Sequence, residues 1–134
     1  MITVLLLLLA SEVYGVPPEL ALGVGFVETR FQARLVGTSG ELGVGQCMPY
    51  GRLTSLGGLH VSRQVERVYL QSELGGALES AARLAEWRRI STSWAESLCR
   101  YNAGTVCTER GKRYAEQVMH AAELFRRLMG GPVS

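Results

Sequence analysis

The chain has 134 residues, of which 47% are apolar and 19% charged, and its formal net charge is +2. This composition is typical of a globular protein and excludes a disordered chain, and the length predicts a single domain over residues 1–134. The small net charge and the lack of a basic, aromatic-rich patch argue against a nucleic-acid partner. No spacing of cysteines and histidines predicts a metal site, and we expect no cofactor.

Residues 1–10 form an apolar run, MITVLLLLLA, in which Thr3 is the one polar residue. The run is too short to cross a bilayer as a helix, so no strong membrane anchor is expected. It has the length of the apolar part of an export signal, but no Lys or Arg precedes it and no A-x-A site follows it. Residues 1–15 are therefore either the first helix of the core, an interpretation that we favour slightly, or an imperfect export signal.

A second helix is expected from Pro18 to about Phe31, because proline suits the first helical turn and Glu19 suits its positive end. Its apolar residues fall on one face, at Leu20, Val24, Val27 and Phe31. Glu28 lies at the edge of this face, where burial raises a carboxyl pKa in the direction that suits a general acid. Taken alone, such a residue is more often a surface glutamate paired with a nearby arginine.

A glycine-rich turn follows at residues 37–45 and presents Gln46. The density of glycines favours a tight loop that a ligand can approach closely, and the Gln46 amide can both donate and accept hydrogen bonds with sugar groups. A plain connection between two helices is the alternative. Residues 48–58 are expected to form a short helix and a turn.

Residues 61–90 predict a long helical stretch. Val65 and Val68 begin its expected apolar stripe, and Gly75-Gly76 indicates either a kink or a close helix contact. Four charged residues near its end are expected to form a solvated face: Arg83, Glu86, Arg88 and Arg89.

Ser93 and Glu96 form a capping box for a helix from Trp94 to Tyr101, which ends at residues 102–104. A last helix is expected over residues 111–129, and alternating strand patterns are absent, so the predicted fold class is mostly α with little or no β structure. Cys99 and Cys107 flank the 102–104 turn and are either a small disulfide loop or two free thiols. Cys47 is expected to be a small buried residue.

Three segments, taken in order, resemble the signatures of soluble lytic transglycosylases of the SLT type, which have a goose-type lysozyme-like fold. The first is Glu28-Thr29 with Phe31, followed by GELGVGQCMP at residues 40–49. The second is Tyr101-Asn102-Ala103-Gly104, and the third is Tyr114-x-x-x-Val118. The resemblance covers about residues 14–118. The chain departs from the family at Thr29 (usually Ser), at Glu41 (usually Ala) and at Val44-Gly45 (usually Leu-Met), the last of which we expect to remove a bulky side chain from the groove.

The resemblance implies cleavage of the β-1,4 bond between N-acetylmuramic acid and N-acetylglucosamine in peptidoglycan. Glu28 would act as general acid and then as base to leave a 1,6-anhydro-muramyl end, without a second protein carboxylate. The chain has no Asp at all. The implied substrate-binding residues are Thr29, Gln46, Met48, Tyr101, Asn102 and Tyr114.

Two alternatives stay open. One is a hydrolytic muramidase that cleaves the same bond, with Glu41 assisting a water molecule. The other is a non-catalytic wall-binding part of a virion or secretion assembly, since a fold alone does not fix a function. The expected location is periplasmic, secreted or virion-associated, and the expected partner is the glycan strand of peptidoglycan.

Overall fold

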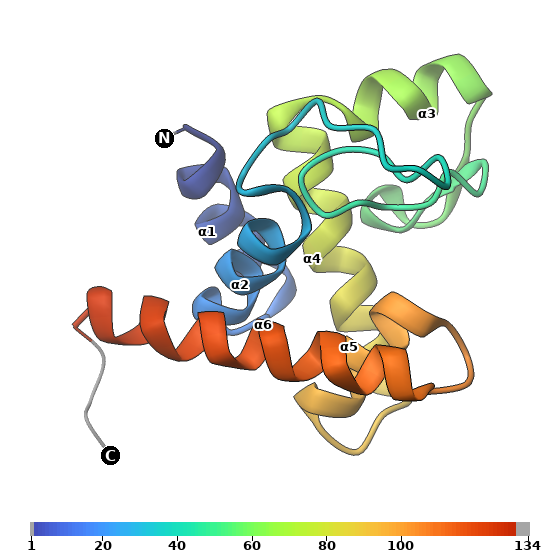
Figure 1. Cartoon of the computed structure of the whole chain (residues 1–134). Helices are drawn as coiled ribbons and strands as arrows, with labels where there is room; N and C mark the ends of the chain where they lie inside the picture. The colour runs from blue at the N-terminus through green and yellow to red at the C-terminus, as the bar shows by residue number, and fades with distance from the viewer. Residues whose placement is uncertain (1, 131–134) are drawn as a thin grey trace.

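The computed structural model describes residues 2–130, which form six α-helices and one small hairpin. Figure 1 shows their arrangement. The mostly α fold predicted from the sequence is confirmed. In chain order the elements are α1 (Ile2–Tyr14), α2 (Pro18–Thr29), β1 (Arg52–Leu53), the 3-10 helix η1 (Thr54–Leu56), β2 (Leu59–His60), α3 (Arg63–Leu70), α4 (Glu73–Arg89), α5 (Trp94–Ala103) and α6 (Glu109–Leu128).

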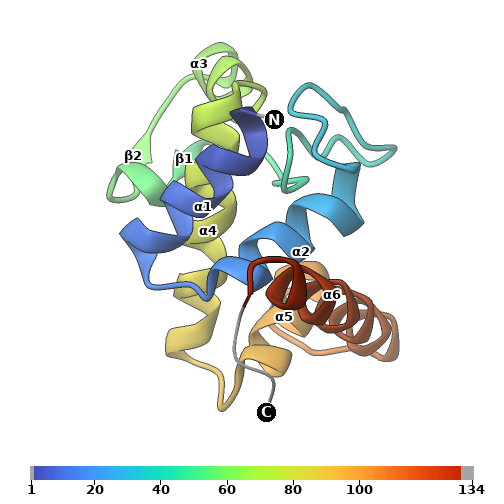
Figure 2. The ribbon, with the colours of Figure 1, turned by 90° about the vertical axis from the view of Figure 1, so that its left-hand side faces the viewer.

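Helix α1 is part of the core. It packs against α4 and α2 (Figure 2), and the side chains of Leu7 and Ala10 are fully buried. Of the two interpretations of this segment, the structure therefore supports the core helix over residues 2–14. One face of α1 stays exposed, at Ile2, Leu5, Leu9 and Val13. Within residues 2–130, none of the helices combines the length and hydrophobicity needed to span a bilayer.

Helix α2 is the central element, since it packs against α1 on one side and α6 on the other. All six residues from 20 to 25 are buried. Gly23 permits the close approach of α6, because a β-carbon there would lie 2.9 Å from the Val118 carbonyl oxygen. The helix ends at Arg30, which has a left-handed backbone with φ of 55° and donates its N–H to the Phe26 carbonyl at 2.9 Å, while the next N–H, of Phe31, donates to the Gly25 carbonyl at 3.1 Å. Glu28 thus lies in the last turn of the most buried helix.

The predicted helix over residues 61–90 is two helices. The chain breaks at Gln71-Ser72, where the Ser72 hydroxyl caps α4 by accepting the Gly75 N–H. Gly75 and Gly76 lie in the first turn of α4 and make a close contact with the end of α3, because a β-carbon on Gly76 would meet the Leu70 carbonyl at 2.7 Å. The predicted apolar stripe was wrong at its start, since Val65 and Val68 are exposed on α3.

The short helix and turn expected at residues 48–58 are confirmed in part, as the 3-10 helix η1 and the turn at Gly57-Gly58. They lie inside a β1–β2 hairpin of two-residue strands that was not expected, in the register Arg52 to His60 and Leu53 to Leu59. Leu53 joins Leu42, Cys47 and Leu70 in a small apolar cluster that is separate from the main core. This cluster holds the loop of residues 30–51 against β1 and α3, on the same end of the molecule as α3 (Figure 1).

Candidate active site

Glu28 lies in a cavity of about 200 Å³ between α2, the glycine-rich loop, α4 and α5. Five of the seven sequence-predicted site residues line this one cavity: Glu28, Gln46, Met48, Tyr101 and Asn102. They come from positions up to 74 residues apart in the chain, so the fold and not the local sequence brings them together. Glu41 lines the same cavity and is the second carboxylate in it.

The carboxyl group of Glu28 has a pKa raised from 4.5 to about 7. Burial is the main cause, because it disfavours the charged form, and the negative charge of Glu41 adds to it. The interaction with the Tyr114 hydroxyl acts in the opposite direction. A carboxyl group with a pKa near 7 holds its proton in about half of the molecules at neutral pH and can both give and take a proton.

Tyr114 on α6 is buried beneath Glu28, and together with Glu28 and Asn102 it lines a second cavity of about 440 Å³. Burial and the Glu28 charge hold the pKa of its hydroxyl well above the usual value, so the hydroxyl is a proton donor. The hydroxyl interacts with Glu28 but forms no hydrogen bond of standard geometry with any atom of residues 2–130. Because the hydroxyl is itself buried, this donor is available to a reoriented Glu28 carboxylate.

The Gln46 side chain fastens the glycine-rich turn. Its amide nitrogen donates to the carbonyls of Leu35 at 3.2 Å and Gly43 at 3.0 Å, which occupies the donor side of the amide. Its oxygen lies beside Gly37, where a β-carbon would collide with it. The Gln46 amide was expected both to donate and to accept hydrogen bonds with sugar groups. Because its N–H groups are used inside the protein, only its oxygen remains as an acceptor at the cavity wall.

Thr29 does not line the cavity, and its prediction as a substrate contact is corrected. The residue is 3% exposed, and its hydroxyl lies 3.0 Å from the Val44 carbonyl and 3.2 Å from the Gly25 carbonyl. The hydroxyl also accepts the Gln32 N–H at 3.1 Å. Thr29 joins the end of α2 to the turn, so it is a positioning residue for the neighbouring Glu28.

Gly45 was expected to open the groove, but it is buried and serves packing instead. A β-carbon there would lie 2.6 Å from the Tyr101 hydroxyl. That hydroxyl donates to the Gly45 carbonyl at 2.7 Å and lies 3.1 Å from the Ser80 hydroxyl. Tyr101 therefore holds the turn in place, while its ring stacks on Tyr114 with centroids 6.4 Å apart.

Cys47 is buried, and its sulfur lies 3.7 Å from the Tyr101 hydroxyl. Burial raises the pKa of its thiol to about 11, so the thiol stays protonated at neutral pH. The prediction of a small buried residue is confirmed.

Arg83 and Glu79 form a buried pair that the sequence analysis missed. Arg83 was expected on a solvated face, but its side chain is 11% exposed, and its Nε donates to Glu79 at 2.7 Å. Its Nη1 donates to the Met48 carbonyl at 2.7 Å, next to the cavity. Glu79 also accepts from the backbone N–H groups of Thr54 and Ser55, so the pair fixes the hairpin and the loop together. The only available signal was the i, i+4 spacing, which surface pairs share.

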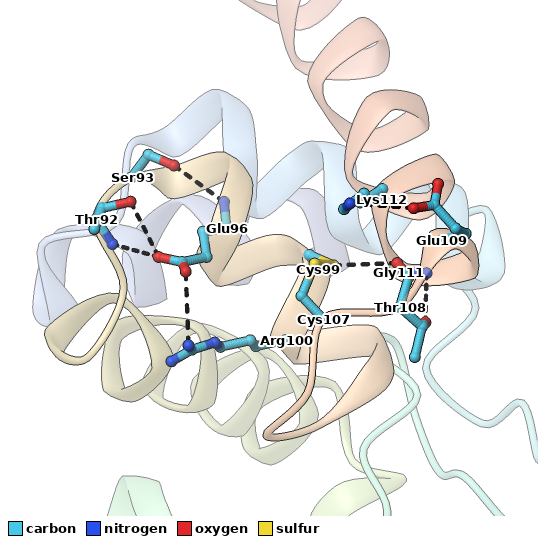
Figure 3. The surroundings of a disulfide bond; sticks show 10 residues. All are labelled: Thr92, Ser93, Glu96, Cys99, Arg100, Cys107, Thr108, Glu109, Gly111 and Lys112. Atoms are coloured by element: carbon cyan, nitrogen blue, oxygen red, sulfur yellow. Dashed lines mark hydrogen bonds and ion pairs between the residues drawn. A yellow bond between two sulfur atoms is a disulfide. The ribbon is translucent and has the colours of Figure 1, made fainter.

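A disulfide joins Cys99 on α5 to Cys107 just before α6 (Figure 3). Its α-carbons are 5.6 Å apart, within the normal range for a disulfide. The structure thus decides between the two alternatives for these cysteines. The loop that it closes contains Asn102, Ala103 and Gly104, which form one wall of the Glu28 cavity. Thr108 caps α6 directly after the bond (Figure 3).

Residues 2–130 hold no cluster of three or more His, Cys, Asp or Glu side chains able to bind a metal ion. No protein-family model matches the chain, and a search of curated proteins finds no match either.

Proposed function

We propose that this protein is a lytic transglycosylase with a lysozyme-like fold, which cleaves the bond between N-acetylmuramic acid and N-acetylglucosamine in peptidoglycan. The observation that carries the proposal is Glu28, a partly buried carboxyl group with a pKa of about 7 at the wall of a cavity between α2, the glycine-rich loop, α4 and α5. Its neighbours Gln46 and Asn102 offer polar groups of the kind that bind sugars. The resemblance in the three sequence signatures supports the same activity.

In the proposed reaction, protonated Glu28 gives its proton to the glycosidic oxygen as the bond to the anomeric carbon breaks. The acetamido oxygen of the substrate stabilises the positive charge that develops on that carbon. Glu28, now a carboxylate, takes the proton of the muramyl 6-hydroxyl, and the oxygen of that hydroxyl bonds to the anomeric carbon. The product carries a 1,6-anhydro ring, and Glu28 regains its proton. A pKa of about 7 suits a group with both roles.

A hydrolytic muramidase is the second candidate, favoured by one observation. Glu41 lines the cavity of Glu28, and its charge contributes to the raised pKa of Glu28. Glu41 could therefore accept a proton from a water molecule, which would give a reducing end in place of the anhydro ring. The Ser39 N–H already donates to Glu41 at 2.8 Å, which orients the carboxylate.

Mass spectrometry of peptidoglycan digested with wild type, Glu28→Gln and Glu86→Gln tests the proposal. Glu86→Gln is the control, because it removes an exposed glutamate that lies outside the cavity. We expect anhydro-muropeptides from wild type and from the control, and a loss of at least about 100-fold in Glu28→Gln, the usual contribution of a general acid. Reducing ends would favour the muramidase. No cleavage by wild type would favour a non-catalytic wall-binding protein.

The proposed location is periplasmic, secreted or virion-associated, and the proposed partner is the glycan strand. The Cys99–Cys107 disulfide supports a location outside the reducing cytosol, because such bonds persist in oxidising compartments. A role in a virion or secretion assembly is compatible with the same substrate.

A further inference from the structure

Two arginine pairs lie beside the Glu28 cavity. Arg63 and Arg67 are one turn apart on α3 and line a cavity of about 510 Å³, which shares Tyr50 with the Glu28 cavity. Arg110 and Arg113 are one turn apart on α6 and line the cavity of about 440 Å³ that contains Glu28 and Asn102. Helices α3 and α6 lie at opposite ends of the molecule in both views (Figures 1 and 2). The two pairs therefore flank the Glu28 cavity.

The four arginines outnumber the carboxylates that line the same cavities, which are Glu66 in the α3 cavity and Glu28 in the α6 cavity. All four are exposed, and none forms an ion pair with a carboxylate within residues 2–130. The nearest acidic residue in sequence to the α3 pair is Glu66, but it is 2% exposed and turned inward to accept the Gly51 N–H at 2.7 Å. Next to the α6 pair, Glu109 is bound by Lys112 at 3.1 Å. Each cavity thus presents guanidinium groups to a ligand.

The walls of the α3 cavity restrict what this ligand can be. Apolar side chains face the arginines across it, contributed by Val36, Leu42, Pro49 and Tyr50. A neutral sugar would leave the guanidinium groups unmatched, whereas a short acidic peptide has both apolar side chains and carboxylates for them. In peptidoglycan every second sugar, the muramyl residue, carries a short peptide with free carboxylates, which we call the stem peptide.

We infer that the two arginine pairs bind carboxylates of the stem peptides, so that the protein prefers glycan strands that still carry them. The inference rests on the proposed function for its substrate, and it adds the part of the substrate that the cavity of Glu28 does not contact. The stems on either side of the cleaved bond extend into the two flanking cavities. An enzyme of this specificity acts on intact wall before stem-removing enzymes have trimmed it.

The test measures binding separately from cleavage. Glu28→Gln, which is expected to leave the strand uncut, is titrated with glycan fragments of equal sugar length, either stem-bearing or trimmed by an amidase that cuts between the lactyl group and the peptide. Trimmed fragments keep one carboxylate next to each muramyl ring, so the comparison isolates the peptide. We expect binding of stem-bearing fragments to be about tenfold tighter, the size of a few partly exposed charge pairs, and this preference to shrink as salt rises.

Three double variants in the Glu28→Gln background show which arginines cause the preference for stem-bearing fragments. Arg63→Gln with Arg67→Gln, and Arg110→Gln with Arg113→Gln, should each reduce the preference and leave the affinity for trimmed fragments unchanged. Arg52→Gln with Arg89→Gln is the matched control, because both arginines are exposed and line a cavity that shares no residue with that of Glu28. The control should keep the full preference, and circular dichroism should confirm that each variant is folded.

Equal affinity for stem-bearing and trimmed fragments overturns the inference. It is also overturned if the arginine variants lose affinity for both fragment types equally, because the arginines would then contact the sugars. Failure of the proposed function has a different signature. If wild type leaves peptidoglycan uncut while the stem preference is present and depends on the arginines, the enzyme proposal fails and the stem-binding inference stands. Absence of binding to any glycan overturns both.

Discussion

The raised pKa of Glu28 predicts that replacing this residue stabilises the protein in a pH-dependent way. The folded protein holds the Glu28 proton up to about pH 7, whereas the unfolded chain releases it near 4.5. Between these values folding takes up a proton, so the stability associated with Glu28 is fully present below pH 4.5 and is lost as pH rises through 7. Glu28→Gln cannot ionise and does not suffer this loss.

The magnitude follows from the shift. The difference between 7 and 4.5 is about 2.5 pKa units, which at about 1.4 kcal/mol per unit gives an upper value of about 3.5 kcal/mol. The stability of Glu28→Gln relative to wild type should therefore rise by up to about 3.5 kcal/mol between pH 4.5 and pH 8.5. For a chain of this size that corresponds to an increase in Tm of roughly 10 °C.

Urea and thermal denaturation of the two proteins at a series of pH values measures this directly, with Glu86→Gln as the control for the loss of one negative charge. Only the change of relative stability with pH is compared, so an effect of the introduced amide on packing that is the same at every pH cancels. A relative stability that does not change with pH would refute the reasoning, because it would mean that Glu28 is solvated. The same titration should appear in catalysis, with the cleavage rate of wild type falling as pH rises above about 7.

Three further predictions concern the residues that hold the site. Thr29→Val removes the hydroxyl that joins α2 to the Val44 carbonyl, and should cost about 1–3 kcal/mol in urea denaturation and lower the cleavage rate, while Thr29→Ser retains both. Glu79→Gln leaves Arg83 as a buried cation without its ion-pair partner and should cost about 3–5 kcal/mol of stability. Because the hydrogen bonds and the charge of Arg83 lower the pKa of Glu79, the stability that Glu79 contributes should be present above about pH 4.5 and lost as pH falls further. A cost of Glu79→Gln that persists unchanged in acid would contradict this prediction. Reduction of Cys99–Cys107 should cost about 2–3 kcal/mol for a loop of this size, and should lower the Tm of wild type while leaving a Cys99→Ala, Cys107→Ala variant unaffected.

The sequence by itself predicted the mostly helical fold and most of the helices, although not the break between α3 and α4 at Gln71-Ser72. Its helices begin and end at strong local signals, such as the Ser93 and Glu96 capping box and the Pro18 start, and these boundaries depend on a few neighbouring residues. The position of Glu28 at the edge of an apolar helix face could also be predicted from neighbouring residues alone. A period of 3.6 residues places a side chain on a face without reference to the rest of the chain.

The sequence was misleading where burial depends on distant segments. Val65 and Val68 have apolar spacing on α3, but no other element of the described chain covers them, and they remain exposed. Arg83 has the pattern of a surface residue, yet the loop and the hairpin fold over it and pair it with Glu79. In both cases the local sequence pattern is the same for a side chain that becomes buried and for one that stays exposed.

The tertiary structure alone decided which polar groups contact each other. The sequence indicated that Thr29, Tyr101 and Gln46 belong to one region, but their hydroxyl and amide groups bond to backbone carbonyls of the turn and position it. Tyr114, from the far end of the chain, is the residue whose hydroxyl interacts with Glu28. Hydrogen bonds act over about 3 Å, and spacing along a chain cannot specify contacts of that length between segments many residues apart.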